Sequence, residues 1–288
     1  FKKVGLTALA GSLLATSAYA GAMSVAGSAS IGVKNNSGSS SHGKSWTMGN
    51  QLTFSGSGET DGGINVSLSF VIDQGDDATT GIANAPFDSH SLTLSTDSMG
   101  TLVFSGEGGS SAQSTLDGTA AGDIWDNGLG ISSPSASEAG NNSMMYTLPS
   151  LMDDLTIQAS YSPGGAGGPS ASAIGFTYAG IEGLSVSYGA GQTETVGSEA
   201  DATTIKGSYA YGSFTFGLSQ TDYDRDSTTD DEVSSWKVSY TVTDDLSITY
   251  GSETHSTGGS TTDEEVEAIS ASFTSGGMTI TAASIEAT

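Results

Sequence analysis

The sequence feature that most constrains the fold is a regular alternation of apolar and polar residues, clearest in VSSWKVSYTVTDDLSITY at residues 233–250. Apolar residues take every second position before the turn Thr243-Asp244-Asp245, and the alternation resumes after it. Because successive side chains of a β-strand point to opposite sides, the pattern predicts a hairpin with one apolar and one polar face. Rings such as Trp236 and Tyr250 lie near the ends of the apolar face.

The same pattern recurs along the chain and predicts fifteen strands of about ten residues, the last at Met278–Glu286. Short turns alternate with longer connections. The short turns are predicted near Thr60–Gly63, Asp97–Gly100, Pro149–Asp154, Ala179–Gly183, Tyr211–Ser213, Thr243–Asp245 and Ser275–Gly277. The longer connections are predicted near Asn35–Lys44, Gln74–Phe87, Gly108–Asn142, Pro163–Pro169, Gly197–Asp201, Asp224–Asp231 and Ser256–Asp263.

Composition decides where the apolar faces point. Only 35% of the residues are hydrophobic, which is low for a soluble globule of 288 residues. The chain is therefore either disordered, or its apolar side chains face the outside of the fold and not a buried core. The regular alternation argues against disorder. The net charge of −25 opposes nucleic acid binding and favours cations, while the absence of cysteine excludes a disulfide framework.

The first twenty residues have the three parts of an export signal. Lys2-Lys3 is basic, Val4–Ala15 is apolar but too short to span a bilayer, and an Ala-x-Ala site ends at Ala20. We predict a signal peptide at 1–20, the alternative being an amphipathic core helix. No later segment is apolar enough for a membrane helix, so a membrane crossing would require a closed barrel.

Alternating loop lengths predict an all-β fold, a transmembrane antiparallel up-and-down β-barrel of about sixteen strands. Single-chain bacterial barrels have an even number of strands. The odd count, the first residue Phe1 and the end at Thr288 lead us to expect a fragment, with residues 21–288 forming a C-terminally incomplete barrel domain.

This pattern, with segments such as Tyr146–Ser150 and Leu155–Tyr161, resembles the sixteen-stranded trimeric general porins of Gram-negative bacteria, most of all those of marine alphaproteobacteria. The resemblance implies an outer-membrane, water-filled channel for passive diffusion of small hydrophilic solutes and ions. It also implies a homotrimer, contacts with outer-membrane lipid and lipopolysaccharide, and a third loop folded into the lumen. One departure is the end at Ala287-Thr288, where such barrels carry an aromatic residue.

The longest connection, residues 108–142, is the candidate constriction, because structureless loops of this length are usually functional. If it folds inward, as the resemblance implies, its acids line the narrow passage. These candidates are Asp117, Asp123 and Asp126, with Glu107 and Glu138 at the ends of the loop. The alternative is a disordered outer loop.

Three lysines share the polar parity of their strands and are predicted to face the lumen: Lys34, Lys206 and Lys237. An outward charge at the centre of the bilayer would cost about 2–4 kcal/mol. Lys206 and Lys237 could form a basic wall facing the acidic loop, or they could only neutralise nearby carboxylates. The net charge predicts a weak cation preference.

Asp222, Asp224 and Asp226 have the alternating spacing of a calcium loop. Ser227 and Val233 replace the turn glycine and the bidentate glutamate of such loops, which favours a solvated acidic loop. The only cofactor we expect is loosely bound Ca²⁺ or Mg²⁺, including ions bridging to lipopolysaccharide phosphates.

The sequence offers little support for an enzyme, because His42, His90 and His255 are scattered and no spacing identifies a Ser/His/acid site. The alternative function is that of a secreted or surface β-rich adhesin or structural protein without a channel. A β-solenoid of that kind repeats at a fixed period, whereas the strand spacing here is uneven.

Overall fold

The computed structural model describes residues 23–36, 43–73, 88–116, 118–122, 137, 141–164, 169–195, 197–226, 229–275 and 278–287. The predicted signal peptide lies outside these residues and stays a prediction. The chain divides into two compact units, residues 1–109 and residues 110–288, and each is described by itself.

The first unit is a meander of five antiparallel strands, each paired with the next along the chain. The strands are β1 (Ser24–Asn36), β2 (Gly43–Glu59), β3 (Asn65–Asp73), β4 (Ser89–Thr96) and β5 (Gly100–Glu107). Apolar side chains such as Val25, Ile31 and Leu68 are exposed on one face. The alternation therefore does not build a buried core in this unit.

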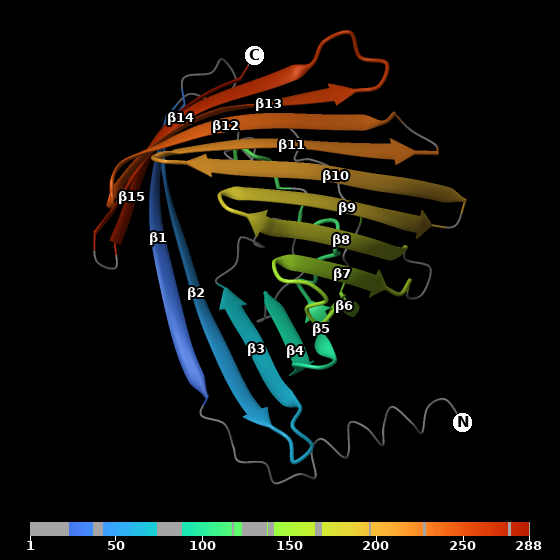
Figure 1. Cartoon of the computed structure of the whole chain (residues 1–288). Coiled ribbons are helices and arrows are strands. Elements are labelled where there is room, and N and C mark those ends of the chain that lie inside the picture. The colour runs from blue at the N-terminus through green and yellow to red at the C-terminus, as the bar shows by residue number, and fades with distance from the viewer. Residues whose placement is uncertain are drawn as a thin grey trace. The chain divides into compact units, whose positions relative to one another are not determined.

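The second unit is a meander of ten strands, and β7 to β13 lie side by side in Figure 1. They are β6 (Ser143–Thr147), β7 (Leu155–Ser162), β8 (Ser170–Ile181), β9 (Leu184–Thr195), β10 (Ser198–Tyr211), β11 (Phe214–Arg225), β12 (Asp231–Thr243), β13 (Leu246–Thr257), β14 (Glu264–Ser275) and β15 (Met278–Ala287). The prediction of fifteen strands is confirmed for the described residues. Their lengths, from 5 to 17 residues, vary more than predicted.

The hairpin predicted at residues 233–250 is confirmed. It consists of β12 and β13, which are joined at Asp244-Asp245. One connection was predicted wrongly. Residues 197–201 are not a long loop, because β10 already begins at Ser198 and pairs with the end of β9. Gly197 has a φ of +84°, a conformation open to glycine, and this lets the chain reverse tightly.

The two faces of the second unit differ in burial. Large apolar side chains stay exposed on one face, including Ile205, Leu218 and Trp236. Rings pair along this apolar face, with centroids 4.8 Å apart for Phe214 and Tyr240. The opposite, polar face buries hydroxyl and carboxyl side chains instead. Among the described residues, no helix is long and apolar enough to cross a membrane.

Candidate functional site

Part of the long connection lies against the polar face of the second unit. We call residues 110–116 and 118–122 the seated segment. The Ala112 N–H donates to Ser160 Oγ of β7 at 2.8 Å. The Ala120 N–H donates to Ser235 Oγ of β12 at 2.7 Å and to Ser219 Oγ of β11 at 3.0 Å. Hydroxyls of this polar face, which forms the wall on which the segment lies, thus satisfy backbone groups that would otherwise be buried without partners.

Side chains add further links between the seated segment and the wall. Gln113 Nε2 donates to Thr204 Oγ1 of β10 at 2.9 Å. The Thr119 hydroxyl donates to the carboxylate of Glu253 on β13. Gln113, Thr204 and Glu253 are fully buried. The segment therefore contacts strands from β7 to β13 and is held on the wall by specific hydrogen bonds.

Glycines in the strands make room for this contact. The glycine track consists of Gly175 on β8, Gly189 and Gly191 on β9, Gly217 on β11 and Gly251 on β13. A Cβ at Gly175 would lie 2.5 Å from the Ala112 carbonyl oxygen, and one at Gly189 would lie 3.1 Å from Gln113 Cα. Strand glycine commonly marks a close approach of another backbone, and here that backbone is the seated segment.

The predicted acidic residues fall mostly outside the described part of the chain. Asp117, Asp123, Asp126 and Glu138 belong to the residues that the structure does not describe. Glu107 is the last residue of β5 in the first unit, where its register partner is His90. The acidic side of the constriction stays a prediction.

The structure places two of the three predicted lysines beside the seated segment. The Lys206 ammonium donates to the Gly118 carbonyl oxygen. Lys237 is the register partner of both Gly217 and Gly251, so its side chain lies between two track glycines. A Cβ at Gly217 would lie 3.1 Å from Lys237 Cγ. Lys34 lies on β1, and its side chain is outside the described residues.

The sequence reasoning missed the residues that hold the segment: Gln113, Thr204, Ser219, Ser235 and Glu253. Serine and threonine occupy so many positions on the polar faces of the strands that the pattern did not single out Thr204, Ser219 or Ser235. The glycine track was a usable signal, because its members lie inside strands on the polar parity rather than in turns.

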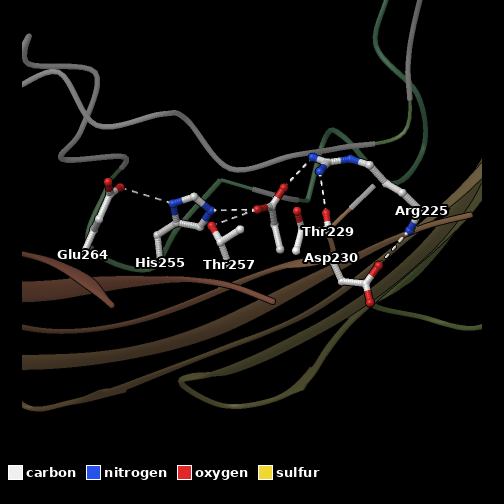
Figure 2. Close-up of polar contacts among 7 residues, drawn as sticks. Arg225, Thr229, Asp230, His255, Thr257 and Glu264 are labelled. Carbon is white, nitrogen blue, oxygen red and sulfur yellow. Dashed lines mark hydrogen bonds and ion pairs between the residues drawn. The ribbon is translucent and has the colours of Figure 1, made fainter. Parts of the chain in front are cut away.

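A second polar cluster lies at the loop ends of β11 to β14 (Figure 2). Arg225 forms an ion pair with Asp231 and stacks 4.6 Å from the centroid of the Tyr223 ring. His255 Nε2 lies 3.2 Å from Asp231 Oδ1, and His255 Nδ1 lies 3.4 Å from Glu264 Oε2. The cluster thus ties four strands together where the long connections begin.

Asp231 lies at the loop end of β12, beyond the apolar band that starts at Trp236. Burial opposes its ionisation, but the hydrogen bond to His255 and the charge of Arg225 outweigh burial. The pKa of the Asp231 carboxyl is therefore held below its ordinary value of 3.8. A lowered pKa stabilises the fold above pH 3.8, and this contribution is lost as pH falls toward the lowered pKa.

We expect Asp231→Asn to remove this acid-sensitive contribution. Near neutral pH the variant should be less stable than the wild type by no more than about 1 kcal/mol. The difference should shrink as pH falls below 3.8, which urea unfolding followed by tryptophan fluorescence can measure. Asp244→Asn, in the exposed turn after β12, is the matched control. An Asp231→Asn difference that stays constant across this pH range would contradict the assignment.

Asp222 and Asp224 lie on β11, and Asp226 follows the strand. Asp222 and Asp224 help line a cavity of about 300 Å³. Across the described part of the chain, however, no three His, Asp or Glu side chains are arranged to hold a metal ion.

The family model described as Gram-negative porin matches residues 5–288. No curated protein matches this chain. Three solved structures resemble it: a porin refined at 1.8 Å resolution, a loop L8 deletion mutant of the outer membrane protein OmpT from Vibrio cholerae, and an anion-selective porin from Comamonas acidovorans.

The first two structures each have a TM-score of 0.68 and 14% sequence identity to this chain. The alignment covers 92% of this chain for the porin and 93% for the OmpT mutant, and 94% of the other chain in both cases. The Comamonas structure has a TM-score of 0.62 and 16% identity, and covers 92% of this chain and 90% of its own. At these identities the structures establish the fold alone.

Proposed function

We propose, from the premise that this chain belongs to the Gram-negative porin family, that it forms a weakly cation-preferring channel narrowed by the seated segment. As a porin it is an outer-membrane β-barrel with a water-filled channel. The apolar face meets lipid and the polar face lines the water, as in other barrels of this class. Passage through such a channel requires a suitable width and lining charge, and no covalent step.

The contact of the seated segment with the polar face is the observation that supports a narrowed channel. Non-helical backbone at membrane depth is tolerated where it is buried in protein or lines a water-filled cavity. The Ala112 and Ala120 amides meet this requirement through wall hydroxyls. A segment held on the lining occupies part of the channel cross-section, so its position affects which solutes pass.

Charge supports the cation preference. The chain carries 32 Asp and Glu residues against 7 Lys and Arg residues. The Comamonas porin is anion-selective although it shares the fold, so lining charge and not architecture must set the preference. The acids of the loop are proposed to line the passage together with Lys206 and Lys237, which lie beside the seated segment.

Reconstitution of the protein in planar bilayers tests this function. We expect stepwise conductance and, under a salt gradient, a reversal potential of the sign given by weak cation preference. The preference should fade as the salt concentration rises, because the Debye length falls to about 3 Å at 1 M. Bilayers without conductance steps would overturn the channel, and anion preference at low salt would overturn the charge assignment.

Lys237→Gln should strengthen the cation preference, because the variant removes a positive charge beside the seated segment. The permeability ratio of potassium to chloride is the measurement. Lys237→Arg retains the charge and is the matched control, for which we expect the wild-type ratio. An unchanged ratio in Lys237→Gln would show that this lysine is neutralised and takes no part in selection.

A homotrimer in contact with outer-membrane lipid and lipopolysaccharide completes the proposal, together with loosely held Ca²⁺ or Mg²⁺ near Asp222 and Asp224. Exposed apolar side chains such as Leu218 support the lipid contact, and the acidic lining of the outer cavity supports loose cation binding. Crosslinking in native membranes would test the trimer.

A further inference from the structure

We propose that Gln113 is the positioning residue of the channel, holding both ends of the long connection on the wall and so setting the width of the passage. The proposal rests on the proposed channel function. The positioning role depends on neutral hydrogen bonds where the long connection contacts the wall, and not on the charges that line the passage.

The Gln113 amide joins two distant parts of the chain. Its Nε2 donates to Thr204 Oγ1 on β10 at 2.9 Å. Its Oε1 accepts from both the backbone N–H and the hydroxyl of Ser137, each at 2.8 Å. Ser137 lies on the returning side of the connection, so one side chain fixes the outgoing and returning chain to the same strand.

Neighbouring contacts orient this amide. Ser111 Oγ lies 2.6 Å from Ser137 Oγ, and Thr204 Oγ1 lies 2.9 Å from Thr221 Oγ1 on β11. Gln113 and Thr204 are fully buried, and Ser111 and Ser137 are nearly so. A buried network of this kind has little tolerance for a missing member, because each orphaned group loses its partner without gaining water.

The backbone at Gln113 lies close to β9. A Cβ added at Gly189 would lie only 3.1 Å from Gln113 Cα. A smaller residue at 113 would lose the link to Thr204 and Ser137. Loss of this link should favour detachment, because the Gln113 side chain joins both sides of the connection to β10.

Gln113→Ala tests the proposal. We expect the ratio of detached to seated segment to rise about tenfold, as expected when buried hydrogen-bond groups lose their partner. In planar bilayers this should appear as larger single-channel conductance and increased open-channel current noise. Thr204→Val should shift both quantities in the same direction, and Thr204→Ser, which keeps the hydroxyl, should restore the wild-type values.

Gln158→Ala is the matched control, because Gln158 is a glutamine of β7 that donates to Thr147 of the neighbouring strand β6 and, among the described residues, makes no hydrogen bond to the seated segment. Heat-modified electrophoretic mobility confirms that each variant is folded. If folded Gln113→Ala channels have wild-type conductance and noise, the proposal is overturned while the channel function stands.

A second measurement does not depend on conductance. The chain has no cysteine, so Ala112→Cys introduces a single thiol at a fully buried position beside Gln113. Maleimide should label this thiol about tenfold faster in the Gln113→Ala background than beside native Gln113. Equal labelling rates would overturn the positioning role even if the protein conducted no current.

Discussion

Replacing Leu218 with Arg lowers the free energy of unfolding by about 2–4 kcal/mol in a lipid bilayer. Leu218 is 66% exposed on the apolar face of β11, with Trp236 as its register partner on β12. On a soluble surface an exposed Leu→Arg change would cost little, because the guanidinium would be hydrated. In a barrel the same position faces hydrocarbon, where charge is expensive. Urea unfolding from vesicles gives the free energy directly.

Thr215→Arg is the matched control, because Thr215 lies on the same strand but on the polar face. Water hydrates an arginine on this side, so we expect the stability to change far less than in Leu218→Arg. Equal losses in the two variants, or none in Leu218→Arg, would show that the apolar face of β11 does not meet lipid.

Replacing Gly175 with Ala should displace the seated segment. The added Cβ would lie 2.5 Å from the Ala112 carbonyl oxygen, which belongs to the backbone and cannot turn away as a side chain would. Either the segment moves and the Ala112–Ser160 hydrogen bond breaks, or the wall is strained by about 1–3 kcal/mol. We expect a changed single-channel conductance together with a lower midpoint of thermal unfolding.

Gly207→Ala separates this effect from a general cost of filling a strand glycine. At Gly207 an added Cβ would approach only the Ser185 carbonyl oxygen, at 3.9 Å. We expect wild-type conductance and unfolding from this variant. If Gly175→Ala behaved in the same way as Gly207→Ala, the close approach of the seated segment to β8 would be wrong.

Strand number and strand faces were predictable because both depend on neighbouring residues. The order Trp236, Lys237, Val238 assigns opposite sides to lysine and its neighbours whatever the rest of the chain does. Connection lengths were less predictable. Residues 197–201 were predicted to form a longer connection, but pairing of Ser198 and Glu199 with β9 extended the strand instead.

The seating of the long connection is a different matter. Its links join residues far apart in the chain, with 91 positions separating Gln113 from Thr204 and 134 separating Thr119 from Glu253. Strand glycines such as Gly175 and Gly189 are a signal that some backbone approaches closely, but the sequence analysis did not use it and no local pattern names the partner. Lysine parity predicted that Lys206 lies on the polar face, yet its bond to the Gly118 carbonyl oxygen depends on where the segment lies.

The amino-acid pattern alone therefore accounts for an outward apolar face, an inward polar face and the hairpins between them, since alternation is a property of adjacent residues. The three-dimensional arrangement was needed to show which wall groups hold the connection. Many Ser, Thr and Gly residues share the polar parity, and only the spatial approach of the seated segment selects Thr204, Ser235 and Gly175 from among chemically equivalent neighbours.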